Sequence, residues 1–243
     1  MIRAFIFDLD GTLVETELLK AQAYAAVSQD LLGLSDPDER AIEIYRRIVG
    51  ATDETAARAM TDELGLSDAL QDKVKDSEDP WQALNRLQAQ RYQSEFATGD
   101  RLRSVAYQHA IDLLKEQKAA GRAVAVATSS VTDAADRVAT DLGIRRLLDA
   151  LVGRDQVTNG KPHPEIYLKT AETLGVSADE VVVIEDSETG LEAAVRADMR
   201  CIAIASAFSA DGLRAQSLLD QSSCVYLPDD LPAVVQRHLS EAS

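Results

Sequence analysis

Short, nearly continuous apolar segments alternate along this 243-residue chain with segments of helical periodicity. Strands that are covered on both faces of a parallel sheet are continuously apolar in this way, because neither face meets water. Strands that alternate with helices indicate βαβ units. The pattern therefore predicts an α/β fold, a Rossmann-like parallel sheet flanked by helices. The predicted strands are residues 2–7, 123–128, 150–152, 181–184, 201–205 and the short segment 224–226.

The stretch between the first and second predicted strands has a different character. It has no clear strand, it is rich in Ala, Leu, Gln, Glu and Arg, and it keeps helical spacing throughout. Gly- and Pro-containing breaks divide it into four helical segments. We therefore expect a helical-bundle cap domain of residues 15–98, inserted into an α/β catalytic core domain of residues 1–14 and 99–243.

Composition narrows the possible settings and partners. The formal net charge is −16 and the sequence has no basic stripe, which argues against nucleic acid. No apolar run approaches the ~18 residues of a membrane span. Because the first predicted strand begins at residue 2, we expect no signal peptide ahead of it. Cys201 and Cys224 alone make neither a disulfide framework nor a zinc site. We expect a cytoplasmic protein that binds no membrane, and the sequence identifies no protein partner.

Polar residues follow the predicted strands at the points where the strands end. In an open parallel sheet, right-handed crossovers send all carboxyl ends to one edge, and ligands bind outside that edge. Carboxylates follow the first and fourth predicted strands, hydroxyls follow the second, and a lysine precedes the helix predicted at 164–175. The residues that this topology gathers at the edge are Asp8, Asp10, Thr128, Ser129, Ser130, Lys161, Glu185, Asp186 and Ser187.

This set of residues suits phosphoryl transfer. Several carboxylates at one edge repel each other, and Mg²⁺, which prefers oxygen ligands, would neutralise them. Lysine, hydroxyl and backbone N–H groups can hold phosphoryl oxygens, while one carboxylate attacks phosphorus. For Asp8 and Asp10 taken alone, an acidic turn is the competing interpretation, because aspartate is a common turn residue.

Four segments carry a family resemblance. In chain order they read "DLDGTLVETE", "VATSS", "GKPHPEIY" and "VIEDSETGLEAA". They resemble the four ordered motifs of the haloacid dehalogenase superfamily, and together they extend over the part of the chain outside the helical insertion. The insertion itself, directly after the first motif, resembles the C1-type cap of the branch that contains β-phosphoglucomutases and sugar-phosphate phosphatases.

The resemblance implies a role for each motif residue. Asp8 matches the nucleophile and Asp10 the general acid/base, while Thr128 and Lys161 match catalytic residues that hold the phosphoryl group. The expected magnesium ligands are the carboxylates of Asp8 and Asp186 and the backbone carbonyl of Asp10. Glu185 is expected either to bind the ion directly or to contact the residues that do. The expected phosphate-binding residues are Gly11, Thr128, Ser129 and Lys161.

Asp10 favours phosphatase chemistry over the dehalogenation that gives the superfamily its name. A dehalogenase needs no acid to protonate a departing alkoxide, whereas a phosphatase does. We therefore predict a magnesium-dependent phosphatase that acts through an aspartyl-phosphate. The expected substrate is a small phosphorylated metabolite, with a sugar phosphate favoured.

A phosphosugar mutase of the β-phosphoglucomutase type is the main alternative. The segment "IVGATDET" resembles the substrate-specificity loop of the cap, in which those mutases have an arginine three residues after the glycine. Here that position is Asp53, and Lys20 stands where a histidine is expected. Both departures favour the phosphatase, although Arg46, Arg47, Arg58 or Arg91 could supply the missing charge. The predicted cap residues for substrate are Lys20, Gly50, Ala51, Thr52, Asp53 and Arg91.

A catalytically idle binding module on the same fold is a further alternative, because fold does not fix function. An idle descendant would be free to lose motif residues. This chain has kept a residue of the required type at each motif position. The sequence therefore favours an active enzyme, and magnesium-dependent turnover of a generic aryl phosphate separates the two interpretations.

Overall fold

The computed structural model describes residues 1–48, 52–75 and 77–242, and the chain divides into two compact units. One unit comprises Met1–Glu15 and Leu102–Ser243, and the other comprises Thr16–Arg101. Among the described residues, no helix combines the length and apolarity needed to cross a bilayer. Predicted Gly50 and Ala51 lie outside the described residues.

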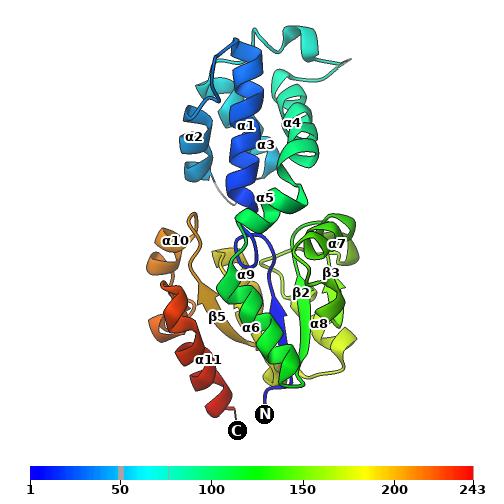
Figure 1. Cartoon of the computed structure of the whole chain (residues 1–243), viewed down its shortest axis with the longest axis vertical. Helices are drawn as coiled ribbons and strands as arrows, with labels where there is room; N and C mark the ends of the chain where they lie inside the picture. The colour runs from blue at the N-terminus through cyan, green and yellow to red at the C-terminus, as the bar shows by residue number, and fades with distance from the viewer. Residues whose placement is uncertain (49–51, 76, 243) are drawn as a thin grey trace. The chain divides into compact units, whose positions relative to one another are not determined.

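The first unit is built on a six-stranded, fully parallel sheet in the order β3-β2-β1-β4-β5-β6. This confirms the predicted fold class. β1 lies at the centre, where the strand order changes direction, and it pairs with both β2 and β4 (Figure 1). The strands are β1 (Ala4–Phe7), β2 (Ala123–Ala127), β3 (Ala150–Val152), β4 (Val181–Glu185), β5 (Arg200–Ile204) and β6 (Cys224–Val225).

Helices cover both faces of this sheet, which explains the continuous apolar strands. Helices α8 and α9 pack on one face, and α6 and α11 contact the sheet through β2 and β5 (Figure 1). Every residue of β1 is fully buried, because Ala4 and Ile6 face α8 and α9 while Phe5 and Phe7 point to the other side. The helices are α6 (Gln108–Ala119), α7 (Thr132–Asp141), α8 (Glu165–Leu174), α9 (Glu188–Arg196), α10 (Ala210–Ala215) and α11 (Leu231–Ser240).

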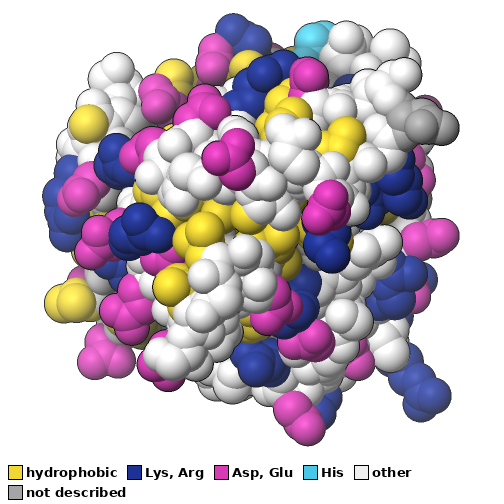
Figure 2. All heavy atoms as spheres, turned by 90° about the horizontal axis from the view of Figure 1, so that it is seen from above, with side chains coloured by type: hydrophobic (Ala, Val, Ile, Leu, Met, Phe, Trp, Pro, Cys, Tyr) yellow, Lys and Arg dark blue, Asp and Glu magenta, His cyan; other side chains and the backbone are white. Residues whose placement is uncertain are grey.

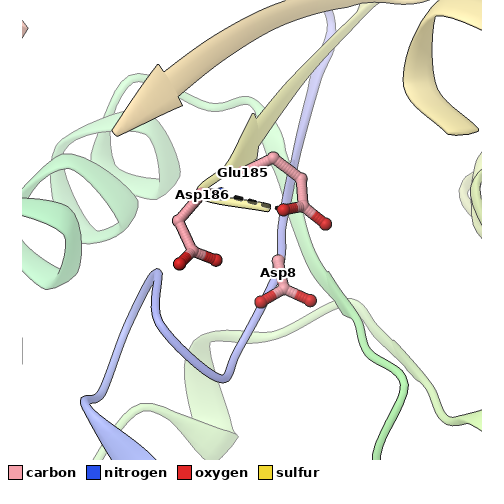
Figure 3. Close-up of side chains that lie close together, drawn as sticks. All are labelled: Asp8, Glu185 and Asp186. Carbon is pink, nitrogen blue, oxygen red and sulfur yellow. Dashed lines mark hydrogen bonds between the residues drawn. The ribbon is translucent and has the colours of Figure 1, made fainter. Parts of the chain in front are cut away.

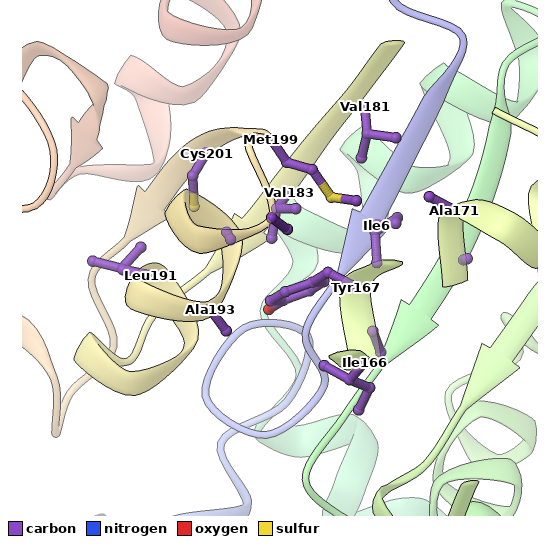
Figure 4. Packing of buried hydrophobic residues seen from close by; sticks show 14 of the residues in the cluster. Ile6, Ile166, Tyr167, Ala171, Val181, Val183, Leu191, Ala193, Met199 and Cys201 are labelled. Carbon is purple, nitrogen blue, oxygen red and sulfur yellow. The ribbon is translucent and has the colours of Figure 1, made fainter. Parts of the chain in front are cut away.

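The core beneath α8 and α9 contains one large polar-tipped side chain. In Figure 4, Ile6, Tyr167 and Val183 lie together between the sheet and these helices. Tyr167 is fully buried in this cluster and belongs to α8, which packs against β1. Because a buried phenol needs a hydrogen-bond partner, its hydroxyl must reach a polar group at the edge of this core.

The second unit is a helical bundle built mainly from four helices, with a short 3₁₀ turn, Gln71–Lys73, before the last of them. A π-helical turn, Tyr92–Phe96, follows the bundle, and α5 (Gly99–Ser104) leads back toward the first unit's sequence. Helix starts follow ordinary capping rules: the Thr52 hydroxyl accepts from the Thr55 N–H at 3.2 Å at the start of α3. The four helices are α1 (Thr16–Leu32), α2 (Arg40–Ile48), α3 (Asp53–Glu63) and α4 (Pro80–Arg91).

The charged surface is mixed on the face that Figure 2 shows. Acidic and basic side chains are interspersed over this face, with apolar side chains visible between them. Many of the charged groups of the described residues form exposed pairs, such as Arg47 with Glu63 and Arg58 with Glu54. Such exposed pairs contribute little to stability, about 0–1 kcal/mol each. The stability of the fold therefore depends on the apolar core.

The central position of β1 gives a direct test of the fold. Ile6→Ala should lower the free energy of unfolding by about 2–5 kcal/mol, because it opens a cavity at a fully buried site. Val195→Ala, at a side chain that is 38% exposed, should change it by no more than about 0.5 kcal/mol. Urea unfolding followed by circular dichroism measures both. Equal effects of the two substitutions would contradict the assignment of β1 to the core.

Candidate active site

The ends of β1, β2 and β4 bring the predicted motif residues to one edge of the sheet. Asp8 directly follows β1, and its N–H donates to the Ile184 carbonyl at 2.9 Å, which continues the pairing with β4. Thr128 directly follows β2, and Glu185 is the last residue of β4. Because β1 lies between β2 and β4, the side chains that leave these three strand ends converge.

Lys161 lies between two of the converging carboxylates. Its Nζ is 2.6 Å from Asp8 Oδ1 and 2.6 Å from Glu185 Oε1, and it also donates to the Ala127 carbonyl at 3.2 Å. The Lys161 side chain is only 4% exposed. Burial alone would lower the pKa of Lys161, but attraction to Asp8 and Glu185 raises it above its ordinary value. The lysine is therefore a fixed, buried positive charge at the site.

Protein donors occupy both oxygens of the Glu185 carboxylate. Oε1 accepts from Lys161 and from the Tyr167 hydroxyl at 2.9 Å, which supplies the partner that the buried phenol needs. Oε2 accepts from the Asp186 N–H at 2.8 Å (Figure 3). It also accepts from the Ser187 N–H at 2.9 Å and from the Ser187 hydroxyl at 3.0 Å. Burial opposes ionisation of Glu185, but Lys161 and these donors bring its pKa below the usual value.

Helix α9 packs directly against Glu185 through a glycine. A Cβ atom on Gly190 would lie 1.7 Å from Glu185 Oε1, so a larger residue there would displace the carboxylate. The same turn of helix is capped by Ser187, whose hydroxyl accepts from the Gly190 N–H at 3.1 Å. The motif segment "EDSETG" thus closes a compact turn around Glu185, and this turn fixes the position of Lys161.

Asp10 occupies a different environment from Asp8. It is partly exposed, and its Oδ2 accepts from the Ser130 hydroxyl at 2.7 Å and from the Thr128 hydroxyl at 3.3 Å. Asp8 is 6% exposed and bonded to the Lys161 ammonium. Two carboxylates that are two residues apart therefore have separate partners, one a buried cation and the other a pair of hydroxyls.

Gly11 allows Asp186 to approach the first motif closely. Gly11 has a φ of +94°, and a Cβ atom there would lie 2.3 Å from Asp186 Oδ2. Both the backbone conformation and the close approach therefore require glycine. The buried Thr12 hydroxyl lies 3.5 Å from Asp186 Oδ1. The first motif thus supplies the carboxylates of Asp8 and Asp10 and also positions the Asp186 carboxylate of the fourth motif.

Three buried carboxylates form the part of the site that can hold a cation. Ligand oxygens of Asp8, Glu185 and Asp186 lie within 4.8 Å of one another, and Figure 3 shows the three side chains facing a common space. Burial, with a smaller effect from neighbouring carboxylates, raises the pKa of Asp8 to about 8 and that of Asp186 well above its usual value. A bound cation would reverse both pKa shifts, so this donor set suits a metal ion.

The predicted cap residues belong to the helical unit, and the two basic ones already have charged partners. Lys20 pairs with Glu17 at 2.6 Å, and Arg91 pairs with Asp30. Thr52 caps α3 and Asp53 is its first residue, so the negative charge of Asp53 also favours the start of that helix.

The structure also shows site residues that the sequence reasoning did not select. Ser130, which the strand topology places at this edge but to which the sequence assigns no role, contacts Asp10, whereas the predicted Ser129 is exposed. Tyr167 contacts Glu185 from inside an apolar helical pattern that conceals its role. The side chains of Ser206 and Ser209, in the loop after β5, oppose the rise in the pKa of Asp186. The available signal for Ser206 was the rule that polar residues after parallel strands gather at one edge, which applies to β5 as well.

Comparisons with known proteins agree with this geometry. Residues 2–198 match the family model of the haloacid dehalogenase-like hydrolases. A Thermotoga maritima protein named phosphorylated carbohydrates phosphatase is 31% identical over 83% of this chain and 84% of its own length. Hexitol phosphatase B of Escherichia coli is 30% identical over 84% of this chain and 83% of its own. A T. maritima crystal structure with the provisional name β-phosphoglucomutase superposes with a TM-score of 0.71 at 26% identity, covering 97% of this chain and 99% of that one.

The match extends over both ends of the motif set, from Asp8 to Asp186, and two relatives of known name are at least 30% identical over most of their length. The chain therefore belongs to the haloacid dehalogenase-like hydrolase family, as the four motifs predict.

The close approach at Gly11 generates a test of the site. Gly11→Ala should reduce phosphatase activity at least tenfold, because the new methyl group must displace the Asp186 carboxylate. Gly175→Ala is the matched control: it has a similar positive φ of +67° but no atom within 4 Å of the added Cβ. Both variants carry about 1–2 kcal/mol of backbone strain, which thermal unfolding measures. Equal activity in the two variants would contradict the placement of Asp186 in the site.

Proposed function

We propose that the protein is a magnesium-dependent phosphatase of a small phosphorylated metabolite, with a sugar phosphate as the favoured class, that forms an aspartyl-phosphate on Asp8. The observation that carries this proposal is that the two carboxylates of the first motif, Asp8 and Asp10, lie in different environments. Asp8 is buried against the Lys161 ammonium, whereas Asp10 is partly exposed and held by two hydroxyls. One carboxylate thus has the surroundings of a nucleophile and the other those of a proton carrier.

Magnesium fits the oxygen donors at this edge. Asp8 and Asp186 would hold it through their carboxylates and Asp10 through its backbone carbonyl. Glu185 has five protein donors on its two oxygens, which supports a role in holding Lys161 beside the ion rather than in direct contact with it. When bound, the ion supplies positive charge that offsets the repulsion between the carboxylates and the phosphate.

Different residues of the site have different roles in the first half-reaction. Asp8 attacks phosphorus and the bond to the leaving oxygen breaks, so that the phosphoryl group passes to the Asp8 carboxylate. Lys161 offsets negative charge on the transferring oxygens from its buried position. Thr128 follows the neighbouring strand β2, and its hydroxyl contacts the Asp10 carboxylate at 3.3 Å.

Asp10 moves the protons of both half-reactions. As an acid it protonates the departing alkoxide, and as a base it then accepts a proton from the water that hydrolyses the aspartyl-phosphate. The hydroxyls of Ser130 and Thr128 hold the Asp10 carboxylate in place between these steps. This use of an acid agrees with a phosphatase and has no purpose in dehalogenation.

The cap residues support hydrolysis over phosphosugar isomerisation. A mutase must grip a distal phosphate, and Asp53 would repel it. At ~4 Å each unit-charge pair costs roughly 1 kcal/mol in water and about 4 kcal/mol in a partly shielded site. Among the arginines that could compensate, Arg47, Arg58 and Arg91 already pair with acidic side chains. Two of the similar proteins carry phosphatase names, which supports the same reading.

Replacement of the nucleophile tests the proposed chemistry. Asp8→Asn should reduce turnover of a sugar phosphate to less than about 1% of wild type with the fold intact, because an amide cannot form the acyl phosphate. Asp133→Asn, at an exposed acid on α7, is the matched control and should retain full activity. Phosphate release and circular dichroism are the measurements. Retention of more than a few per cent of activity in Asp8→Asn would exclude Asp8 as the nucleophile.

Product analysis separates the phosphatase from the mutase. With β-glucose 1-phosphate and a trace of the 1,6-bisphosphate, the unmodified protein should release inorganic phosphate without needing the bisphosphate. Asp53→Arg should raise the affinity for bisphosphorylated sugars, because it removes the repulsion and adds an attractive charge. Glucose 6-phosphate as the main product of the unmodified protein, with little free phosphate, would establish the mutase instead.

A further inference from the structure

The segment 128–132 connects the end of β2 to the start of α7, and two of its hydroxyls hold Asp10. The Thr128 and Ser130 hydroxyls both donate to Asp10 Oδ2, at 3.3 and 2.7 Å. The Thr128 hydroxyl also accepts from the Ser130 N–H at 3.1 Å, so these two side chains are fixed relative to each other. The direction of the Asp10 carboxylate therefore depends on the backbone of this segment.

A second segment, residues 152–156, lies at the end of β3 and holds the first one. The Thr128 N–H donates to the Val152 carbonyl at 3.0 Å, which continues the pairing of β2 with β3. Two residues further along each segment, the Arg154 N–H donates to the Ser130 carbonyl at 2.9 Å. The backbone of the residue that contacts Asp10 is thus tied to the end of a neighbouring strand.

The carboxylate of Asp155 makes a third contact, at the first residue of α7. Asp155 Oδ1 accepts from both the N–H and the hydroxyl of Thr132, each at 2.7 Å. The Gln156 side-chain amide donates to the same hydroxyl at 2.8 Å. The hydrogen bonds from Thr132 hold the pKa of Asp155 below its usual value. The carboxylate is therefore ionised near neutral pH, and its hydrogen bonds are of the stronger, charge-assisted kind.

Gly153 lets the two segments approach each other closely. A Cβ atom on Gly153 would lie 2.4 Å from the Thr132 backbone nitrogen and 2.7 Å from the Thr132 hydroxyl oxygen. A side chain at this position would therefore displace the start of α7, which packs beside β3 (Figure 1). The start of the helix is thus fixed against the end of β3 by close packing as well as by hydrogen bonds.

We propose that Asp155 is a positioning residue for Asp10, which holds the segment 128–132 so that its hydroxyls keep the Asp10 carboxylate directed at the leaving oxygen; this inference rests on the proposed function. Asp155 is exposed, and it acts on Asp10 only through the backbone between Thr132 and Ser130. Small displacements of this backbone matter, because catalytic groups must be held within about 0.5 Å of the productive geometry. Loss of Asp155 would transfer the Thr132 N–H to water and free the segment to move.

Phenyl phosphate and 4-nitrophenyl phosphate test this role in the full-length protein with magnesium. The two substrates have similar shapes, but phenolate, whose pKa is ~10 like that of the tyrosine side chain, needs a proton to leave. The less basic 4-nitrophenolate leaves without one. The kcat/KM reports the steps up to phosphoryl transfer, and so it isolates Asp10 as an acid from its later role as a base.

Asp155→Ala should lower kcat/KM about tenfold for phenyl phosphate, a part of the roughly 10²–10⁴-fold that a general acid contributes, and less than about threefold for 4-nitrophenyl phosphate. Asp155→Asn keeps an oxygen that can accept from the Thr132 N–H, and it should lose less than about threefold on either substrate. Asp133→Ala is the matched control, because it removes an exposed acid from the first turn of the same helix and should leave both values unchanged.

Equal losses on the two substrates, or no loss on either, would overturn the inference, because a residue that only supports the fold cannot distinguish leaving groups. If Asp155→Ala does not fold, Thr132→Ala replaces it, with a twofold change in the ratio of the two kcat/KM values as the threshold. Asp10→Asn is the benchmark for the acid itself. If Asp10→Asn shows no preference for 4-nitrophenyl phosphate, the acid role in the proposed function fails and this inference fails with it. A preference in Asp10→Asn but not in Asp155→Ala overturns the inference alone.

Discussion

The active edge of this protein depends on one buried ammonium group. Moving a lysine charge out of water costs several kcal/mol, and it is offset here by two carboxylates at 2.6 Å and a backbone carbonyl. Those carboxylates belong to adjacent strands, so the pair can form only if β1 and β4 are neighbours in register. The Tyr167 hydroxyl ties the same cluster to the apolar core. The position of Lys161 therefore depends both on the pairing of β1 with β4 and on the packing of α8, which carries Tyr167.

The same cluster explains how one short motif supplies two chemically different carboxylates. Asp8 continues the strand pairing and points into the buried cluster, whereas Asp10 follows the turn begun by Leu9 and reaches the hydroxyls after β2. Burial raises the pKa of Asp8, and Lys161 opposes that rise, so its charge responds to any cation that enters. Asp10 keeps contact with solvent, as a residue that exchanges protons requires. The environment, rather than the residue type, assigns the roles.

The sequence predicts most of this arrangement because the strands and the ordered motifs are local patterns. Continuous apolar runs locate β1 to β5, and the rule for parallel strand ends gathers Asp8, Lys161 and Asp186 at one edge. The missed residues act through contacts between distant segments. The loop after β5 comes beside the end of β4 only because these two strands pair, and the hydroxyl of Tyr167 is invisible in the periodicity of α8. The sequence pattern does not indicate which of the predicted cap side chains face the substrate. Two of these predicted residues, Gly50 and Ala51, lie outside the described residues.

The central claim is that the phosphoryl group passes through Asp8, and chemical trapping tests it most directly. Borohydride reduces an acyl phosphate of aspartate to homoserine, which tandem mass spectrometry can locate within the peptide that contains both Asp8 and Asp10. The account predicts homoserine at position 8 during turnover, and only when both substrate and magnesium are present. Turnover without any reduced residue, or reduction at Asp10 in place of Asp8, would contradict it.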